Sequence, residues 1–266
     1  MVLLYDHPLS PYAQKCRIAL REKGVAFEAR LPAAIGSGSG MEPAFVDANP
    51  RAEVPALVDG DVRVFDSTII LEYIEERWPE PKLLPAAPAQ RARVRMLEEA
   101  MDTHYEAINW GLGEIHFFRR ATGELAKSMS ERAAAQTAAW RRWLERQLGD
   151  ATWFNGAAFG WGDLAVAPYL NGSRGFGMEP ERGSRLAAWL ARANSRESVA
   201  QTSAEAAAFL RGAGGGMGNV SDLVAKGLFK REYRDHRLEW MIRTGGMSVV
   251  LEGLERGNIR FARDFD

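Results

Sequence analysis

The residue pair with the clearest chemical potential is Ser10-Pro11, a hydroxyl side chain followed by a proline. Serine at the N-cap and proline at the first helical position are typical of a helix start. The unpaired N–H groups and the positive end of the helix dipole favour an anion there, and the hydroxyl adds a hydrogen-bond donor. Ser10 is therefore a candidate for binding an anionic group of a ligand, unless it only caps the helix. Tyr12 and Tyr5 are rival hydroxyls, although we expect Tyr5 to be a core residue of a strand.

A second helix start lies at Asp66-Ser67, where we expect Ser67 to cap the helix. The N–H groups of a helix start suit a carboxylate ligand, so this pair is a second candidate for ligand binding. Upstream of it, Glu53-Val54-Pro55 opens a predicted hairpin. From the sequence alone, Pro55 is equally an ordinary proline at the start of a strand, and both helix starts can be plain caps.

Short strands and helices must position these residues. The apolar residues 2–5 indicate a buried strand, residues 11–24 a helix and residues 25–31 a second strand, which together predict two parallel strands. A Gly/Ser-rich loop at 36–40 follows, and Asp59-Gly60-Asp61 forms the turn of the hairpin.

Beyond residue 88 the strand signals almost vanish and helical periodicity dominates. Residues 91–120 and 125–148 have the pattern of long amphipathic helices. Shorter helices and a tail with two more amphipathic stretches are predicted after them, at 163–170, 184–193, 195–210, 223–242 and 247–254.

Composition limits the class of protein. The chain has 266 residues, of which 46% are hydrophobic and 26% charged, as in a globular protein with a full-sized core. With 34 Lys plus Arg and 35 Asp plus Glu, the net charge of −1 gives no reason to expect nucleic acid or a membrane surface as partner. A single cysteine and a start without a signal-like segment favour a cytoplasmic protein.

Four motifs in this order resemble the cytosolic glutathione transferase family, and the resemblance covers about residues 2–210. They are Ser10-Pro11-Tyr12-Ala13-Gln14-Lys15, Glu53-Val54-Pro55-Ala56-Leu57, Asp66-Ser67-Thr68-Ile69-Ile70 and Gly162-Asp163-Leu164-Ala165-Val166-Ala167-Pro168. The resemblance implies a thioredoxin-like α/β N-terminal domain and an all-α C-terminal domain. We place these domains at 1–78 and 89–211, with a linker at 79–88 and a helical extension at 212–266.

The resemblance also assigns roles to the residues named above. Ser10, or Tyr12 in its place, would stabilise the thiolate of glutathione. Pro55 would be cis, leaving the Val54 backbone free to pair with the peptide backbone of glutathione. Asp66 and Ser67 would hold its γ-glutamyl group, with Glu53 as a second acidic contact or a solvated charge.

The sequence departs from the family pattern in two places. No basic residue lies between Arg30 and Arg51, so the partner of the glycyl carboxylate of glutathione is unassigned. Gly160 stands where the helix motif usually has Ser or Thr, so Asp163 would cap that helix alone.

The long helix at 91–120 supplies candidates for an acceptor-substrate pocket. Asp102, Tyr105, Asn109, Gly113 and His116 fall at steps of three and four beside the apolar stripe. Tyr105, Asn109 and His116 are therefore pocket candidates, unless they form a solvated flank. Aromatic residues are further candidates or core residues: Trp110, Phe117, Phe118 and Trp161.

Two other kinds of chemistry are disfavoured. Cys16 lies in the apolar stripe of the first helix, which indicates a buried hydrophobe rather than the nucleophile of a reductase. His104 and His116 have no acidic or cysteine partner at ligand spacing, so we expect no metal site.

The sequence hypothesis is a homodimeric glutathione transferase, with glutathione as co-substrate. Its thiolate would attack a small, largely apolar electrophile in a conjugation, an ether cleavage or an isomerisation. The alternative is a non-catalytic binding or regulatory module with the same fold. The charged run at 230–237 and the Gly-rich break at 214–216 leave the role of the tail open.

Overall fold

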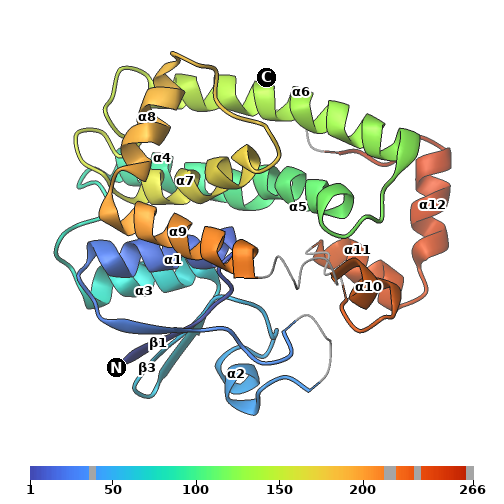
Figure 1. Ribbon diagram of the computed structural model, residues 1–266, viewed down its shortest axis with the longest axis horizontal. Helices are drawn as coiled ribbons and strands as arrows, with labels where there is room; N and C mark the ends of the chain where they lie inside the picture. The colour runs from blue at the N-terminus through green and yellow to red at the C-terminus, as the bar shows by residue number, and fades with distance from the viewer. Residues whose placement is uncertain (36–39, 213–219, 231–234, 262–266) are drawn as a thin grey trace.

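The structure is a computed structural model that describes residues 1–35, 40–212, 220–230 and 235–261 (Figure 1). It contains a small α/β layer, a larger helical layer and a C-terminal group of short helices (Figure 1). The predicted fold class, an α/β N-terminal domain followed by an all-α domain, is confirmed. The Gly/Ser loop at 36–39, Gly214 to Gly216 and residues 231–234 of the charged run lie outside the described residues.

The N-terminal domain is a four-stranded mixed sheet with the order β2-β1-β3-β4. β1 pairs in parallel with β2 and antiparallel with β3, and β3 pairs antiparallel with β4. The predicted parallel pair and hairpin are thus confirmed. The elements are β1 (Val2–Tyr5), α1 (Pro11–Glu22), β2 (Phe27–Arg30), α2 (Pro43–Ala48), β3 (Ala56–Asp59), β4 (Val62–Phe65) and α3 (Ser67–Arg77).

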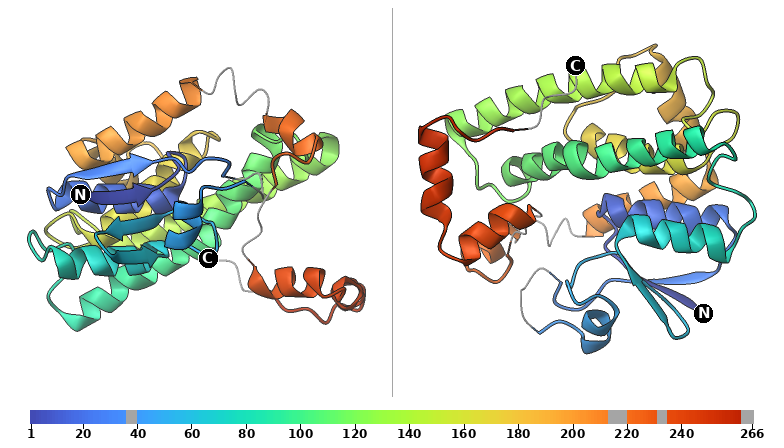
Figure 2. Two further views of the ribbon diagram at one scale, coloured as in Figure 1. Left: turned by 90° about the horizontal axis from the view of Figure 1, so that it is seen from below. Right: turned by 180° about the vertical axis from the view of Figure 1, so that it is seen from behind.

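The two faces of the sheet have different cores because successive strand residues point to opposite faces. Leu4 and Leu57 belong to the main core under α1 and α3. Tyr5 and Ala56 belong to a second core with Phe45 of α2. Figure 2 shows the result: α1 and α3 lie between the sheet and the helical domain. The sequence analysis did not predict α2, a helix of six residues that begins at a proline.

The helical domain consists of helices with short connections. Its elements are α4 (Pro88–Ala100), the π-helical turn η1 (Met101–Tyr105), α5 (Glu106–His116), α6 (Gly123–Leu148), α7 (Trp161–Arg174), α8 (Arg185–Asn194) and α9 (Glu197–Gly212). The predicted long helix is one continuous rod of α4, η1 and α5. Within it, the Glu106 N–H donates to the carbonyl of Met101, five residues back, instead of four.

Asp163 organises the start of α7 in the absence of a serine cap. One carboxylate oxygen accepts from the Gly160 N–H (3.1 Å), and the other accepts from the Phe154 N–H (2.8 Å) and from Nε1 of Trp189 (2.7 Å). Asp163 and Trp189 are fully buried. The prediction that Asp163 caps this helix is confirmed, but Asp163 does not act alone, because Oδ1 of Asn155 accepts from the Gly162 N–H at 3.3 Å.

Ion pairs on α1 bind the N-terminal domain to α9. Arg17 and Arg21 both contact the carboxylate of Glu205, Arg21 at 2.6 Å. Glu22, at the end of α1, pairs with Arg196 at 2.6 Å. These contacts fix the helix that starts at Ser10 against the helical domain.

The C-terminal segment forms three short helices, α10 (Val220–Ala225), α11 (His236–Arg243) and α12 (Met247–Glu255). The predicted continuous stretch over 223–242 is wrong. α10 ends in a turn in which Gly227 has φ +69°, a left-handed conformation that suits glycine, and Asp235 starts α11 as a new N-cap. Of the helices that the structure describes, none is long and apolar enough to span a membrane.

Candidate active site

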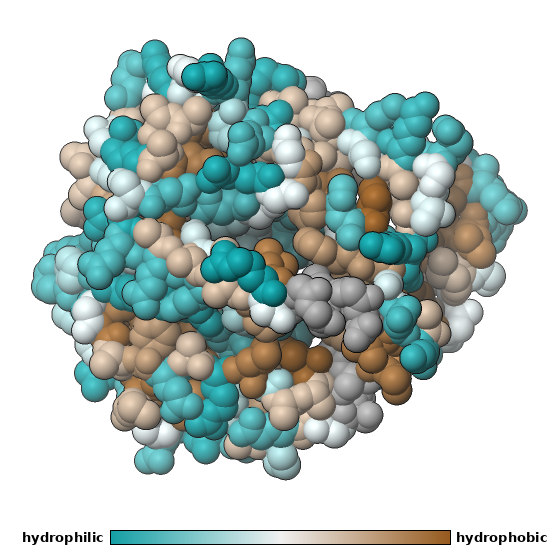
Figure 3. All heavy atoms as spheres, in the orientation of Figure 1, coloured by the Kyte–Doolittle hydropathy of each residue, from teal (hydrophilic) through white to brown (hydrophobic). Residues whose placement is uncertain are grey.

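A cleft of about 2120 Å³ lies between the two domains and contains most of the candidate residues. The N-terminal domain contributes the N-terminus of α1, residues 53–55 and the start of α3. The rod of α4, η1 and α5, together with α7, α9 and the tail, forms the rest of the lining. Hydrophobic residues gather at the centre and right of the face shown in Figure 3.

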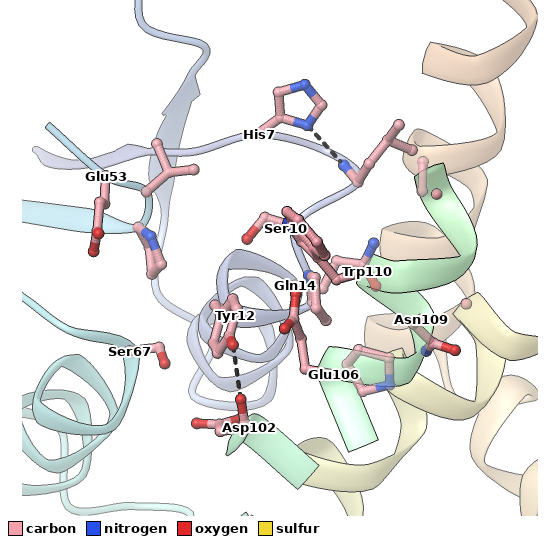
Figure 4. Close-up of a pocket in the computed structure, with 18 of the residues that line it drawn as sticks. His7, Ser10, Tyr12, Gln14, Glu53, Ser67, Asp102, Glu106, Asn109 and Trp110 are labelled. Carbon is pink, nitrogen blue, oxygen red and sulfur yellow. Dashed lines mark hydrogen bonds between the residues drawn. The ribbon is translucent and has the colours of Figure 1, made fainter. Parts of the chain in front are cut away.

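Ser10 is the N-cap of α1. Its Oγ accepts a hydrogen bond from the Ala13 N–H at 3.3 Å, and its own N–H donates to the carbonyl of His7 at 2.8 Å. Figure 4 shows the Ser10 hydroxyl turned toward the side of the cleft that carries Glu53 and Ser67. Because Oγ acts as an acceptor toward Ala13, its O–H proton is available for a ligand.

Tyr12 also lines the cleft, but its hydroxyl is used by the protein. The phenol donates to the backbone carbonyl of Asp102 at 2.7 Å (Figure 4). A phenol has a single O–H proton, so in this arrangement Tyr12 cannot also donate to a ligand. Tyr5, the third hydroxyl, is 2% exposed and packs against Phe45 in the core behind the sheet, as predicted.

The Val54-Pro55 peptide bond is cis, as the family resemblance implied. Val54, Pro55 and Glu53 line the cleft. In the described part of the chain, no backbone hydrogen bond engages the N–H or the carbonyl of Val54. The carbonyl of Glu53, by contrast, accepts from the side chain of Asn49 at 2.7 Å, which anchors this loop.

Asp66, not Ser67, is the N-cap of α3. Its carboxylate accepts from the N–H groups of Thr68 (3.0 Å) and Ile69 (3.3 Å). Ser67 is instead the first helical residue and is 6% exposed. The predicted cap was wrong by one residue because Asp66 has φ +72°, a left-handed conformation that places the turn before Ser67. Such strain in a non-glycine residue is concentrated at functional sites.

A buried ion cluster that the sequence analysis missed lies under the cleft. Lys15 is 0% exposed, and its Nζ contacts Glu98 at 2.5 Å and also contacts Asp102. Glu98 further accepts from Oγ1 of Thr68 (2.9 Å) and Nε1 of Trp161 (2.5 Å). The carboxylates keep Lys15 charged by raising its pKa, although burial alone would lower it.

This cluster connects three elements that border the cleft. Lys15 lies on α1 five residues after Ser10, and Thr68 lies two residues after Asp66 on α3. Glu98 on α4 therefore links the two helix starts to the helical domain. The sequence signal was a lysine within the apolar stripe of α1, which needs a buried partner.

Tyr105, one of the predicted residues of the substrate pocket, lies in the core instead. Tyr105 is fully buried, its OH hydrogen bonds Oγ of Ser173 at 2.8 Å, and burial raises its pKa to about 12. The expectation that it lines the pocket is wrong. Tyr105 ends η1 and packs its ring against that of Trp140, with centroids 5.8 Å apart, whereas Asp102 of the same turn lines the cleft.

Of the other two predicted pocket residues, Asn109 lines the cleft and His116 does not. Asn109 lines the cleft, where its amide donates to the carbonyl of Tyr169 (3.0 Å) and its oxygen accepts from Ser173 (2.8 Å). His116 is exposed outside the cleft formed by the described residues, with its ring 5.2 Å from that of Phe176. The prediction for His116 is therefore wrong.

Two further side chains line the cleft, and the single cysteine lies in the core. His7 lines the cleft, its Nδ1 accepts from the Leu9 N–H at 3.1 Å, and burial lowers its pKa to about 4. Arg51 lines the cleft and lies over the ring of Phe65. Cys16 is fully buried with its thiol pKa raised by burial, which confirms the prediction of an inert core residue. The described residues contain no group of three or more His, Cys, Asp or Glu that could hold a metal ion.

Comparison with known proteins decides the family. Glutathione S-transferase U25 of Arabidopsis thaliana is 32% identical over 216 residues, 76% of this chain and 88% of the relative. The chain belongs to the glutathione S-transferase family. The profile of the glutathione S-transferase N-terminal domain matches residues 4–82.

The chain is also similar to proteins of two different descriptions. A rice glutathione S-transferase solved in complex with glutathione has a TM-score of 0.63 and 28% identity, over 76% of this chain and 89% of that one. A stringent starvation protein A homolog of Coxiella burnetii is 29% identical over 170 residues, 64% of this chain and 75% of the relative. Each identity is low enough that the site must be argued from this chain's own residues.

Proposed function

We propose that this protein is a glutathione transferase in which Ser10 stabilises the thiolate of glutathione. The observation that carries this proposal is that the hydroxyl groups of Tyr12 and Ser10 in the cleft have different hydrogen-bond partners. The Tyr12 proton is used by the Asp102 carbonyl, and Ser10 retains a proton at the N-terminus of α1. A donor at this position lowers the pKa of a thiol through a hydrogen bond and through the helix dipole.

The rest of the proposed glutathione site fits the groups of a tripeptide. The N–H and carbonyl of Val54 can pair with its backbone, as in an added strand. The start of α3, with Ser67, suits the α-carboxylate of the γ-glutamyl group, and Asp66 and Glu53 suit its ammonium. Arg51 is a basic cleft residue that suits the glycyl carboxylate.

The chemistry proposed for the bound state follows from this arrangement. Glutathione supplies the nucleophilic sulfur, and the chain holds that sulfur in a charged form against an electrophile. Asn109 and apolar residues of α5 border the acceptor half of the cleft. We propose a small, largely apolar electrophile and a conjugation, an ether cleavage or an isomerisation, with the rate coming from proximity and the lowered pKa.

The experiment is the pH dependence of thiol conjugation by the Ser10→Ala variant, with Tyr12→Phe as the matched control. Ser10→Ala should reduce kcat at least about tenfold and move the ionisation of bound glutathione to higher pH. Its affinity for glutathione should stay nearly unchanged. Tyr12→Phe should leave the ionisation in place. A shift in Tyr12→Phe and none in Ser10→Ala would transfer the role to Tyr12.

A non-catalytic binding or regulatory module is the second candidate function. The similarity to a stringent starvation protein A homolog supports it. Retention on immobilised glutathione separates a glutathione-binding chain from such a scaffold. We expect the native chain to be retained and an Asp66→Asn, Ser67→Ala double variant to be lost, since Asn can still cap the helix but carries no charge. Failure of the native chain to bind would favour the scaffold.

The oligomeric state of the protein and its location in the cell are the next proposals. We propose a cytoplasmic homodimer that forms through the first domain and the long helices. Ile69 on α3 is 55% exposed and Met96 on α4 is 49% exposed, so both side chains are available for such an interface. We also propose domain limits of 1–78 and 89–211, with a linker at 79–88 and an extension at 212–266. Sedimentation velocity of the native chain and of Met96→Glu tests the dimer.

A further inference from the structure

The loop between β1 and α1 presents Ser10, and hydrogen bonds within the loop fix its shape. The carbonyl of His7 accepts from the Ser10 N–H at 2.8 Å, and Nδ1 of His7 accepts from the Leu9 N–H at 3.1 Å (Figure 4). Nε2 of Gln14 in α1 donates to the carbonyl of Pro8 at 2.7 Å. The backbone that carries the Ser10 hydroxyl therefore depends on three hydrogen bonds, and two of them end at His7.

The ring of His7 is neutral, and its Nδ1 acts as an acceptor. Because the Leu9 N–H donates to Nδ1, the ring proton lies on Nε2. Burial lowers the pKa of His7 to about 4, and the nearby charge of Arg17 lowers it further, so the ring keeps this form at neutral pH. The hydrogen bond to Leu9 is therefore present at neutral and alkaline pH, where a thiolate can form.

Helix α9, which lies beside α1 in Figure 1, holds this loop from the side of the helical domain. The ring of His7 meets the ring of Phe209 edge to face, with centroids 4.9 Å apart. One turn earlier on α9, Glu205 contacts Arg17, which also pairs with the buried carboxylate of Asp6. Because residues four apart lie on one face of a helix, the same face of α9 fixes Asp6 through Arg17 and His7 directly.

We propose that His7 is the positioning residue that places the Ser10 hydroxyl for thiolate stabilisation, with Phe209 of α9 as its support. This inference rests on the proposed glutathione transferase function. His7 acts through the backbone of Ser10 and does not touch the sulfur. The position matters because a hydrogen bond weakens steeply when its length or angle departs from the favoured range. A looser loop therefore raises the pKa of the bound thiol, while Val54 and Ser67, which hold the tripeptide, keep their places.

The test is the ionisation of glutathione bound to His7→Phe, followed by the ultraviolet absorbance of the thiolate. Phenylalanine keeps a ring against Phe209 but cannot accept from the Leu9 N–H. We expect the pKa of the bound thiol to rise, so that below this pKa the thiolate fraction falls about fivefold, the effect of one lost hydrogen bond. The kcat of conjugation should fall in the same proportion and recover at high pH. The affinity for glutathione should stay nearly unchanged, which a general loss of structure would not allow.

Three further variants separate the parts of this proposal. His7→Asn places a side-chain oxygen where Nδ1 lies, so it should keep more of the native ionisation than His7→Phe. Phe209→Ala removes the support on α9 and should also raise the pKa of the bound thiol. His116→Phe is the matched control, because it makes the same exchange beside the ring of Phe176, outside the cleft that the described residues form. It should leave the ionisation unchanged.

An unchanged pKa of the bound thiol in His7→Phe would overturn the role of His7, and so would an equal change in His116→Phe. Should His7→Phe fail to fold, an unchanged pKa in Phe209→Ala would overturn it instead. In each case, a Ser10→Ala variant that still shifts the ionisation leaves the proposed function intact. If the native chain binds no glutathione, or if Ser10→Ala leaves the ionisation in place, the proposed function itself fails.

Discussion

Replacement of Lys15 by methionine should strongly destabilise this protein, because it removes the cation from a buried ion cluster. Lys15 is 0% exposed and is the partner of two carboxylates, Glu98 and Asp102. Methionine fills a similar volume but leaves both negative charges together in the interior. Removing one partner of a buried ion pair typically costs about 3–5 kcal/mol. We expect a loss of that size in the free energy of unfolding at pH 7, measured by urea denaturation.

The pH dependence of this loss follows from the same charges. In the native chain burial and the Glu98 charge raise the pKa of Asp102 while Lys15 lowers it, so without Lys15 the pKa of Asp102 lies further above its value in the unfolded chain. A raised carboxyl pKa in the folded state means that stability falls as pH rises through it, so the deficit should shrink on acidification. The recovery amounts to about 1.4 kcal/mol for each unit by which the pKa is raised. Unfolding at pH 5 and at pH 7 measures this difference.

A double variant isolates the interaction itself. Glu98→Gln alone leaves Lys15 paired with Asp102 and should cost about 1.5–3 kcal/mol, the value of hydrogen bonds to a charged group. Lys15→Met combined with Glu98→Gln leaves one carboxylate, so its loss should be smaller than the sum of the two single losses. Lys127→Met, at an exposed pair 4.0 Å from Glu124, is the control and should change stability by less than about 1 kcal/mol. Additive losses, or a Lys15→Met loss no larger than that of the control, would refute the reasoning.

Three further predictions concern the border of the cleft. Asp66→Gly should have a free energy of unfolding about 1–2 kcal/mol larger than that of Asp66→Ala, because glycine adopts φ +72° without strain and is the better N-cap. Thermal unfolding should therefore show a higher midpoint temperature for Asp66→Gly, and equal midpoints would contradict this. His7 has a folded pKa of about 4 against 6.5 when unfolded, so stability should fall from pH 7 to pH 4 by up to about 3 kcal/mol, and His7→Asn should flatten this slope while the exposed His236→Asn keeps it. Tyr12→Phe should cost about 1 kcal/mol in thermal unfolding, since it removes one hydrogen bond to the Asp102 carbonyl, and no loss would show that this bond contributes nothing.

Local signals were sufficient for much of the fold. Ser10-Pro11 predicted a helix start, and the structure has Ser10 as the N-cap there. The apolar run at Val2–Tyr5 and the turn at Gly60, with φ +60°, predicted a strand and a hairpin that the structure contains. These features depend on residues within a few positions of one another, so a sequence pattern is enough to predict them.

Features that depend on distant partners were not predictable in the same way. The burial of Lys15 becomes favourable only when Glu98, more than eighty residues later, approaches it. The cap at Asp66 rather than Ser67 depends on a positive φ that serine and aspartate do not signal. The prediction for the tail was wrong for a related reason, because a continuous helical pattern over 223–242 does not reveal the turn at Gly227.

The π-turn at Met101–Tyr105 has an effect on how this cleft could change in evolution. A single added residue in a helix turns every later side chain by roughly 100° and advances it by about 1.5 Å. One insertion or deletion in this turn would therefore exchange the whole set of α5 residues that line the cleft. The residues of the proposed glutathione site on α1 and α3 would keep their places, so the rest of the cleft could change while that site stays the same.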